Sequence, residues 1–279
     1  MDVTRISASS YSNTAPLIWS FLYGQNHGKV EIILDTAPAR SAELLSQDRV
    51  DAALVPVIAY QFIDKVRLIP DVCVGAKERV RSVCLVTKGD DLENAKTVSL
   101  DVSSRTSVVL TKIIFREFLG FEPEWRDANP DVDAMLAESD CALIIGDPAL
   151  SIPDQSTPAA VAAGDSSLVT HHSSLRKFDL ANLWHHHTGL GFVFAMWMTR
   201  LDKVSIDFAA ARDEGLAHID EIVSNYESDI PLSRRELKEY LSENISYSVD
   251  APMRQGMDLY FQLAQKNGLL MESKPLTFV

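Results

Sequence analysis

RISASSYSNTAPLIWSFLY, residues 5–23, is the stretch that decides the fold class. Arg5–Ser9 alternates polar and apolar side chains and predicts a short strand, whereas residues 15–23 have the apolar spacing of a helix. The same order of strand, polar turn and helix recurs through the first two thirds of the chain. Such alternation predicts an α/β protein with a mostly parallel sheet and helices on both faces.

The remaining elements follow from the same periodicities. Further strands are predicted at residues 30–34, 52–57, 83–87, 97–100 and 141–145, and helices at residues 40–47 and 103–119. The last third differs, with one long strand at residues 192–199 followed by helices at residues 206–226, 233–245 and 251–267. Ser233 and Glu236 have the spacing of a capping box, and Gly120 and Gly268 are placed to end helices.

This organisation predicts two α/β lobes, with a C-terminal run of helices that returns to the first lobe. The first lobe is expected to comprise residues 1–87 and 185–279, and the second lobe residues 88–184. A cleft between two such lobes is the default position for a ligand site.

Composition narrows the classes of protein to consider. The chain has 279 residues, 46% of them hydrophobic, and 39 acidic against 26 basic residues give a net charge of −13. This balance argues against binding to nucleic acid, which needs clustered Lys and Arg. Without an apolar run of about 18 residues or a signal-peptide pattern, we expect a cytoplasmic protein that does not span a membrane. The three cysteines are widely spaced, and we expect buried free thiols.

Asn13 is the first candidate for a functional residue. It lies in the loop after the first strand, and ligands of open parallel sheets bind at the carboxyl ends of the strands. Its amide can orient an anion or a hydroxyl group without acting as a base. The alternative is that Asn13 only caps the next helix, for which the early Pro16 is suited.

The helix start at residues 103–107 is the second candidate. Ser104, Thr106 and Ser107 supply hydroxyl groups, and the free backbone N–H groups of a helix N-terminus attract anions without a net charge. An acidic protein could bind a carboxylate in this way. The alternative is an ordinary N-cap.

Two further segments lie next to buried strands. Ser82 precedes a strand at the expected first crossing between the lobes and could give a hydroxyl group to the cleft; the alternative is a structural serine. Gly146 and Asp147 end another strand, and Asp147 followed by Pro148 suits the start of a helix. The functional alternative for Asp147 is a general acid, which would need a raised pKa beside an anionic ligand.

The sequence predicts no metal and no organic cofactor. His185–His187 are adjacent, so their side chains point in different directions and cannot converge on one ion unaided. A His-Glu-x-x-His motif and a Gly-x-Gly-x-x-Gly fingerprint are both absent. The residues by themselves therefore indicate a two-lobed protein that binds a small anion, either an enzyme or a receptor.

Several segments together resemble the chorismate dehydratase family of the futalosine route to menaquinone. They are residues 10–17 (SYSNTAPL), 50–56 (VDAALVP), 80–85 (VRSVCL), 104–107 (SRTS), 144–150 (IIGDPAL), 184 with 188–197 (W, TGLGFVFAMW) and 244–247 (NISY). The resemblance covers nearly the whole chain, and the order and spacing of the segments make it specific. Two positions depart from the family pattern: Ser12, where a bulkier apolar residue is expected, and Gly191, where proline is expected.

The resemblance implies a type II periplasmic-binding-protein fold and a carbon–oxygen lyase. Its dicarboxylate substrate would be chorismate, from which loss of water gives 3-[(1-carboxyvinyl)oxy]benzoate. It also implies that Asn13 and Ser82 are catalytic, by fixing the substrate's own enolpyruvyl carboxylate close to the hydrogen that leaves. We expect the substrate to be bound by Ser104, Thr106, Ser107, Gly146 and Asp147.

Two alternatives stay open from the sequence. The sister family, 1,4-dihydroxy-6-naphthoate synthase, shares the fold, but its Pro-rich Asn-Asp-Thr opening is absent here. The other alternative is a non-enzymatic solute-binding protein for a small carboxylate, because most proteins with this fold are receptors. Conversion of chorismate into an aromatic product distinguishes the enzyme from the receptor.

Overall fold

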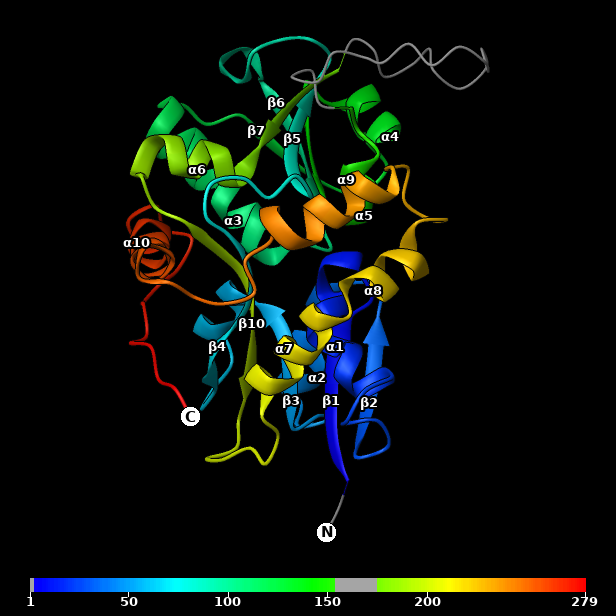
Figure 1. Cartoon of the computed structure of the whole chain (residues 1–279). Coiled ribbons are helices and arrows are strands. Elements are labelled where there is room, and N and C mark those ends of the chain that lie inside the picture. Colours follow the sequence, from blue (N-terminus) through cyan, green and yellow to red (C-terminus); the bar gives the residue numbers. More distant parts are fainter. Residues whose placement is uncertain (1–2, 154–174) are drawn as a thin grey trace.

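The first of two sheets combines strands from the first third of the chain with one strand from the last third (Figure 1). A computed structural model describes residues 3–153 and 175–279. The first sheet has the order β2-β1-β3-β10-β4, in which β1 is parallel to β2 and β3, and β10 is antiparallel to β3 and β4. Its strands are β1 (Thr4–Ser9), β2 (Val30–Asp35), β3 (Ala52–Pro56), β4 (Arg67–Ala76) and β10 (Phe192–Thr199). The central strand β3 is buried along its whole length, as its continuous apolar run predicts.

The second sheet has the order β7-β6-β8-β5-β9. Its strands are β5 (Val83–Thr87), β6 (Thr97–Asp101), β7 (Glu124–Ala128), β8 (Cys141–Ile145) and β9 (Arg176–Asp179). The inner strands β5 and β8 are fully buried. The edge strands β7 and β9 were not predicted from the sequence, because their residues, EWRDA and RKFD, are mostly polar.

One boundary of the predicted division into lobes is wrong. Strand β5 pairs with β8 and β9 and therefore belongs to the second sheet, although residues 83–87 were assigned to the first lobe. The chain crosses between the sheets at residues 77–82, which agrees with the crossing expected before Val83. The return crossing follows α6 (Leu180–Thr188), so a boundary after residue 184 would divide a helix. The division into two lobes stays a proposal, with its boundaries moved to these two crossings.

Helices cover both sheets (Figure 1). The first sheet is accompanied by α1 (Ala15–Leu22), α2 (Pro38–Ser46), α7 (Phe208–Ala217) and α8 (Ile219–Tyr226). The second is accompanied by α3 (Arg105–Ile113), α4 (Val132–Glu138), α5 (Asp147–Leu150) and α6, and the C-terminal part forms α9 (Arg234–Glu239) and α10 (Ala251–Lys266). The single helix predicted at residues 206–226 is wrong, because the chain breaks at His218. The predicted capping box at Ser233 and Glu236 is confirmed. None of the described helices is long and apolar enough to cross a membrane.

Gly191 lies where α10 approaches the first sheet. A Cβ atom on Gly191 would lie 2.6 Å from Cγ of Met253 and 3.0 Å from the carbonyl oxygen of Ala76. On the helix, a Cβ atom on Gly256 would lie 2.1 Å from the Gly191 carbonyl oxygen. The absence of a side chain at Gly191 and at Gly256 therefore permits a close contact between α10 and the return crossing.

Candidate active site

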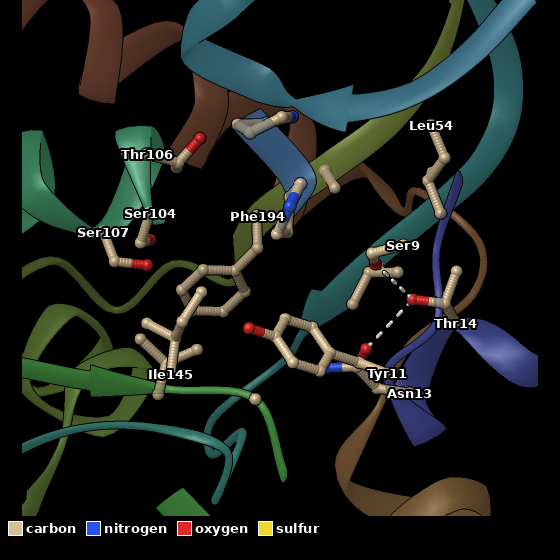
Figure 2. Close-up of a pocket in the computed structure, with 16 residues that line it drawn as sticks. Ser9, Tyr11, Asn13, Thr14, Leu54, Ser104, Thr106, Ser107, Ile145 and Phe194 are labelled. Carbon is tan, nitrogen blue, oxygen red and sulfur yellow. Dashed lines mark hydrogen bonds between the residues drawn. The ribbon is translucent and has the colours of Figure 1, made fainter. Parts of the chain in front are cut away.

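A cavity lies between the two sheets and is lined from both (Figure 2). It encloses about 550 Å³ of space outside protein atoms, part of it open to solvent. Figure 2 shows Ser104 and Ser107 on one side and Ser9 and Thr14 on the other, with Tyr11 and Phe194 between them. The cavity is thus at the carboxyl ends of β1, β3 and β8, where ligands of open α/β sheets bind.

Asn13 lies in the wall on the side of the first sheet. The Ser9 and Thr14 hydroxyl groups are 3.0 Å apart, and the Thr14 hydroxyl group donates to Oδ1 of Asn13 at 3.3 Å (Figure 2). These contacts hold the amide, and the Asn13 side chain also lies close to the buried hydroxyl group of Tyr240. The alternative of a helix cap is wrong, since α1 has Thr14 at its N-cap and no side-chain cap bond.

The start of α3 forms the facing wall, on the side of the second sheet. Ser104 occupies the N-cap position of α3, but its hydroxyl group makes no capping bond. Ser107 is also buried at the cavity, and its hydroxyl group has no partner among the described residues. The Thr106 hydroxyl group differs, because it accepts a hydrogen bond from the backbone N–H of Ile58 at 3.3 Å. The ordinary N-cap alternative is therefore wrong for the Ser104 side chain.

The cavity has no positively charged side chain among the described residues that line it. Arg105, which stands between Ser104 and Thr106, is directed to Glu43, with 3.6 Å between guanidinium nitrogen and carboxylate oxygen. An anion in the cavity would consequently be held by hydroxyl groups, the Asn13 amide and the free backbone N–H groups at the start of α3. Such donors create a positive potential in the cavity without a charged side chain.

Gly146 permits a close approach between the two sides. Its φ of 69° lies in the left-handed region, and a Cβ atom there would lie 2.8 Å from Cε1 of Tyr11. Burial raises the pKa of the Tyr11 hydroxyl group, which points toward Phe194 in Figure 2. Sequence reasoning did not single out Tyr11, although it lies within the segment SYSNTAPL.

Asp147 follows Gly146 but is not among the described residues that line the cavity. Its carboxylate accepts from Ser12: the hydroxyl group at 2.5 Å, and the backbone N–H at 3.2 and 3.1 Å to the two oxygens. Burial raises the pKa of Asp147, and the bonds from Ser12 oppose that rise. Asp147 is the first residue of α5, so the predicted start of a helix at Asp147 and Pro148 is confirmed, although the N-cap residue itself is Gly146.

Ser82 is fully buried behind the wall. It is not among the described lining residues, but its carbonyl oxygen accepts from the backbone N–H of Gly146 at 2.7 Å. The carboxylate of Asp179 fixes the preceding segment by accepting from the N–H groups of Val80 and Arg81. Arg81 has a left-handed φ of 62°, so the chain turns sharply just before Ser82.

Tyr240 is a residue that sequence reasoning missed. It lies in the π-helical turn Tyr240–Asn244 after α9 and is fully buried. Burial raises its pKa; the Ser82 and Asn13 side chains lie close enough to lower it, and the charge of Asp147 raises it further. Even so, the Tyr240 hydroxyl group has no hydrogen bond of normal geometry with a described residue. Tyr240 therefore brings the C-terminal helices to the two predicted catalytic residues.

The histidines of α6 pack at the surface of that helix. The His187 ring stacks on Phe118 with 4.4 Å between centroids, and Nδ1 of His185 lies 3.3 Å from the Leu190 carbonyl oxygen. Over residues 3–153 and 175–279, no three His, Cys, Asp or Glu side chains are grouped as metal ligands. The three cysteines are buried and are not joined in disulfides, as predicted.

Solved structures with the same fold define the class of protein. The chain resembles a protein from Archaeoglobus fulgidus, with a TM-score of 0.72 and 16% identity over 95% of this chain and 98% of the other. A Candida albicans protein described as having the generic periplasmic binding protein fold gives 0.62 and 12%, over 98% and 92% of the two chains. The aliphatic sulphonate-binding protein SsuA from Escherichia coli gives 0.61 and 14%, over 99% and 93%. The fold is therefore of the periplasmic-binding-protein type, as the sequence resemblance implied.

Sequence comparison identifies the family within this class. The chain belongs to the menaquinone biosynthesis family, whose sequence model matches residues 4–266. A chorismate dehydratase from Thermus thermophilus is 30% identical over 256 residues, which cover 90% of this chain and 91% of that protein.

Proposed function

We propose that this chain is a chorismate dehydratase, a hydro-lyase that converts chorismate into 3-[(1-carboxyvinyl)oxy]benzoate. The observation that carries the proposal is the cavity between the sheets, which presents the Asn13 amide opposite the unpaired hydroxyl groups of Ser104 and Ser107. The relationship to the Thermus thermophilus chorismate dehydratase supports the choice of substrate.

The proposed reaction requires little acid–base chemistry from the protein. The hydrogen on C3 leaves as a proton, its electron pair moves into the ring system, and the C4 hydroxyl group leaves as water after gaining a proton. Negative charge develops on the ring carboxylate through the conjugated double bond, and the ring becomes aromatic. Donors placed around that carboxylate would stabilise the transition state more than the ground state.

The two walls of the cavity suit different parts of this substrate. We assign the ring carboxylate to the start of α3, with Ser104, Thr106 and Ser107 and the adjacent backbone N–H groups. We assign the enolpyruvyl carboxylate to Asn13, whose amide would orient it toward C3 so that it can accept the proton. Gly146 would let the backbone of the second wall approach the substrate closely.

Ser82 has a less direct part in this proposal. Its hydroxyl group lies behind the wall next to Tyr240, so its proposed contribution is to hold Asn13 through Tyr240. Asp147 is not proposed as the proton acceptor, because its carboxylate is occupied by Ser12.

Turnover of chorismate tests the proposal. The purified protein is mixed with chorismate, and the products are followed by proton NMR. We expect the C4 carbinol signal to disappear and four aromatic ring signals to appear, at a rate that Asn13→Ala reduces strongly. Binding of chorismate without conversion would instead establish a solute-binding protein for carboxylates.

A further inference from the structure

Ser12 and Asp147 connect the two sides of the cavity directly. Ser12 follows β1 of the first sheet and Asp147 follows β8 of the second, and the two residues are 135 positions apart in the sequence. The Ser12 hydroxyl group donates to the carboxylate at 2.5 Å, and the Ser12 backbone N–H lies 3.2 and 3.1 Å from its two oxygens. Ser12 is completely buried and Asp147 is half-buried, so these bonds are partly shielded from water.

The neighbours of these two residues form the cavity. Asn13 follows Ser12 directly and Gly146 directly precedes Asp147, and both line the cavity. A change in the distance between Ser12 and Asp147 would therefore change the distance between the Asn13 amide and the second wall.

We propose that Ser12 and Asp147 form an inter-sheet clasp, a positioning pair that holds Asn13 at its working distance from the second wall. This rests on the proposed function for its effect on turnover, but the clasp itself is a property of the protein without substrate. Asp147 acts through Ser12 and does not touch the reacting atoms. Other links also join the two sides. The Ile58 N–H after β3 donates to the Thr106 hydroxyl group at 3.3 Å. Arg105 pairs with Glu43, but this ion pair is half-exposed on both partners and contributes less because solvent screens it.

Four variants test the clasp. Ser12→Ala removes the hydroxyl donor and keeps the backbone N–H, Asp147→Ala removes the acceptor, and Asp147→Asn keeps an oxygen that can accept from Ser12. Ser10→Ala is the matched control, because its hydroxyl group donates to the Asp35 carbonyl oxygen within the first-sheet side. We expect Ser12→Ala and Asp147→Ala each to lower kcat/KM for chorismate about tenfold, with Asp147→Asn recovering part of the loss and Ser10→Ala close to wild type.

A double-mutant cycle separates a clasp from two independent residues. The Ser12→Ala/Asp147→Ala protein should be about as impaired as Asp147→Ala alone, because both changes break one interaction. Additive losses would overturn the proposal. So would complete loss of turnover in Asp147→Asn with Ser12→Ala near wild type, since Asp147 would then act on the substrate.

Solution scattering of the protein without any ligand distinguishes failure of the clasp from failure of the proposed function. The wild type should have the radius of gyration calculated from this structure, and the double variant a larger one. A larger radius of gyration in the double variant would support the clasp. If chorismate were not converted in that case, only the proposed function would be overturned. Identical profiles for wild type and double variant would overturn the clasp.

Discussion

The two walls of the cavity use their polar groups in opposite ways. On the side of the first sheet, Ser9, Thr14 and Asn13 bond to one another, so the polar atoms are largely satisfied before any ligand arrives. On the side of the second sheet, the hydroxyl groups of Ser104 and Ser107 have no partner in the described part of the chain. We therefore propose that the first wall orients a group of the substrate and that the second wall binds one.

The largest effect is expected from breaking the orienting wall at Asn13. Asn13→Ala should lower kcat by about 10²-fold or more, because orientation of the enolpyruvyl carboxylate improves the transition state more than the ground state. The melting temperature should change little, because the Asn13 side chain accepts only one hydrogen bond, from Thr14. Steady-state kinetics and thermal unfolding of Asn13→Ala measure both.

Ser82→Ala provides a companion to this test. We expect a smaller loss of kcat here, about five- to tenfold, because Ser82 is proposed to act on Asn13 through Tyr240. The fold should be retained, since the hydrogen bond from the Ser82 hydroxyl group to the Val80 carbonyl oxygen is long, at 3.5 Å. A rise in KM at constant kcat in both variants would contradict the comparison, because the first wall would then be a binding wall like the second.

The binding wall should respond with a smaller and different effect. Ser107→Ala removes one unpaired donor and leaves the backbone N–H groups. We therefore expect kcat/KM to fall about 30-fold, which corresponds to a loss of transition-state stabilisation within about 1–3 kcal/mol. Thr106→Ala should also lower the melting temperature, because it leaves the Ile58 N–H without its acceptor. Thr106→Ser is the control that restores the acceptor. Full activity in Ser107→Ala and in Thr106→Ala would place the anion site elsewhere.

Tyr240 sharpens the comparison, because it reaches the orienting wall from behind. Tyr240→Phe should lower kcat by about five- to tenfold with KM nearly unchanged, since it removes a hydroxyl group that lies beside Ser82 and Asn13. Tyr247→Phe is the matched control: Tyr247 is also buried, and its hydroxyl group likewise lacks a described partner. Removing an unpaired buried hydroxyl should cost little stability in either variant. Equal kinetics of the two variants would show that Tyr240 has only a packing role.

The fold was largely predictable because its central strands are long apolar runs. Three continuous apolar runs predicted buried strands, and all three form them: Ala52–Pro56, Val83–Thr87 and Cys141–Ile145. Gly120 and Gly268, which were predicted to end helices, both have the expected positive φ. Strand β4 (Arg67–Ala76) was missed although it is mostly apolar, because Pro70 and Asp71 interrupt its pattern. The other features that were missed are polar or depend on pairing. Edge strands β7 and β9 have little apolar pattern, and assigning β5 to a sheet required knowledge of its partners.

The candidate site was predictable where one short segment carries it. Five predicted site residues follow shortly after the end of a strand, and all of them line one cavity: Asn13, Ser104, Thr106, Ser107 and Gly146. Asp147 and Ser82 lie just behind the wall, next to residues that line the cavity. No pattern in the sequence distinguishes a side chain that faces the cavity from one that lies behind its wall. Contacts across the fold, such as those of Asp147 with Ser12 and of Tyr240 with Ser82, join segments that have no periodicity in common.

The smallest effect is expected from salt, because neither wall of the cavity has a positive charge that attracts the substrate. A net charge of −13 repels a dianionic substrate at long range, and no described basic residue lines the cavity to reverse the field. Added salt screens this repulsion, with a screening length of about 10 Å at 0.1 M. We therefore expect kcat/KM to rise slightly, by less than about twofold, between low and physiological ionic strength. The assay is kcat/KM for chorismate across a salt series.

Arg105 is the residue that could reverse the sign of this salt dependence. It stands between Ser104 and Thr106 and pairs with Glu43. If the Arg105 guanidinium left Glu43 and bound the substrate carboxylate, salt would screen this attraction, and kcat/KM would fall as the ionic strength rises. Arg105→Gln tests this directly, because it keeps a polar side chain of similar length without the charge. If binding rests on hydroxyl and backbone donors, Arg105→Gln should keep the slight rise with salt. A steep fall in the wild type that Arg105→Gln abolishes would contradict a binding wall without net charge.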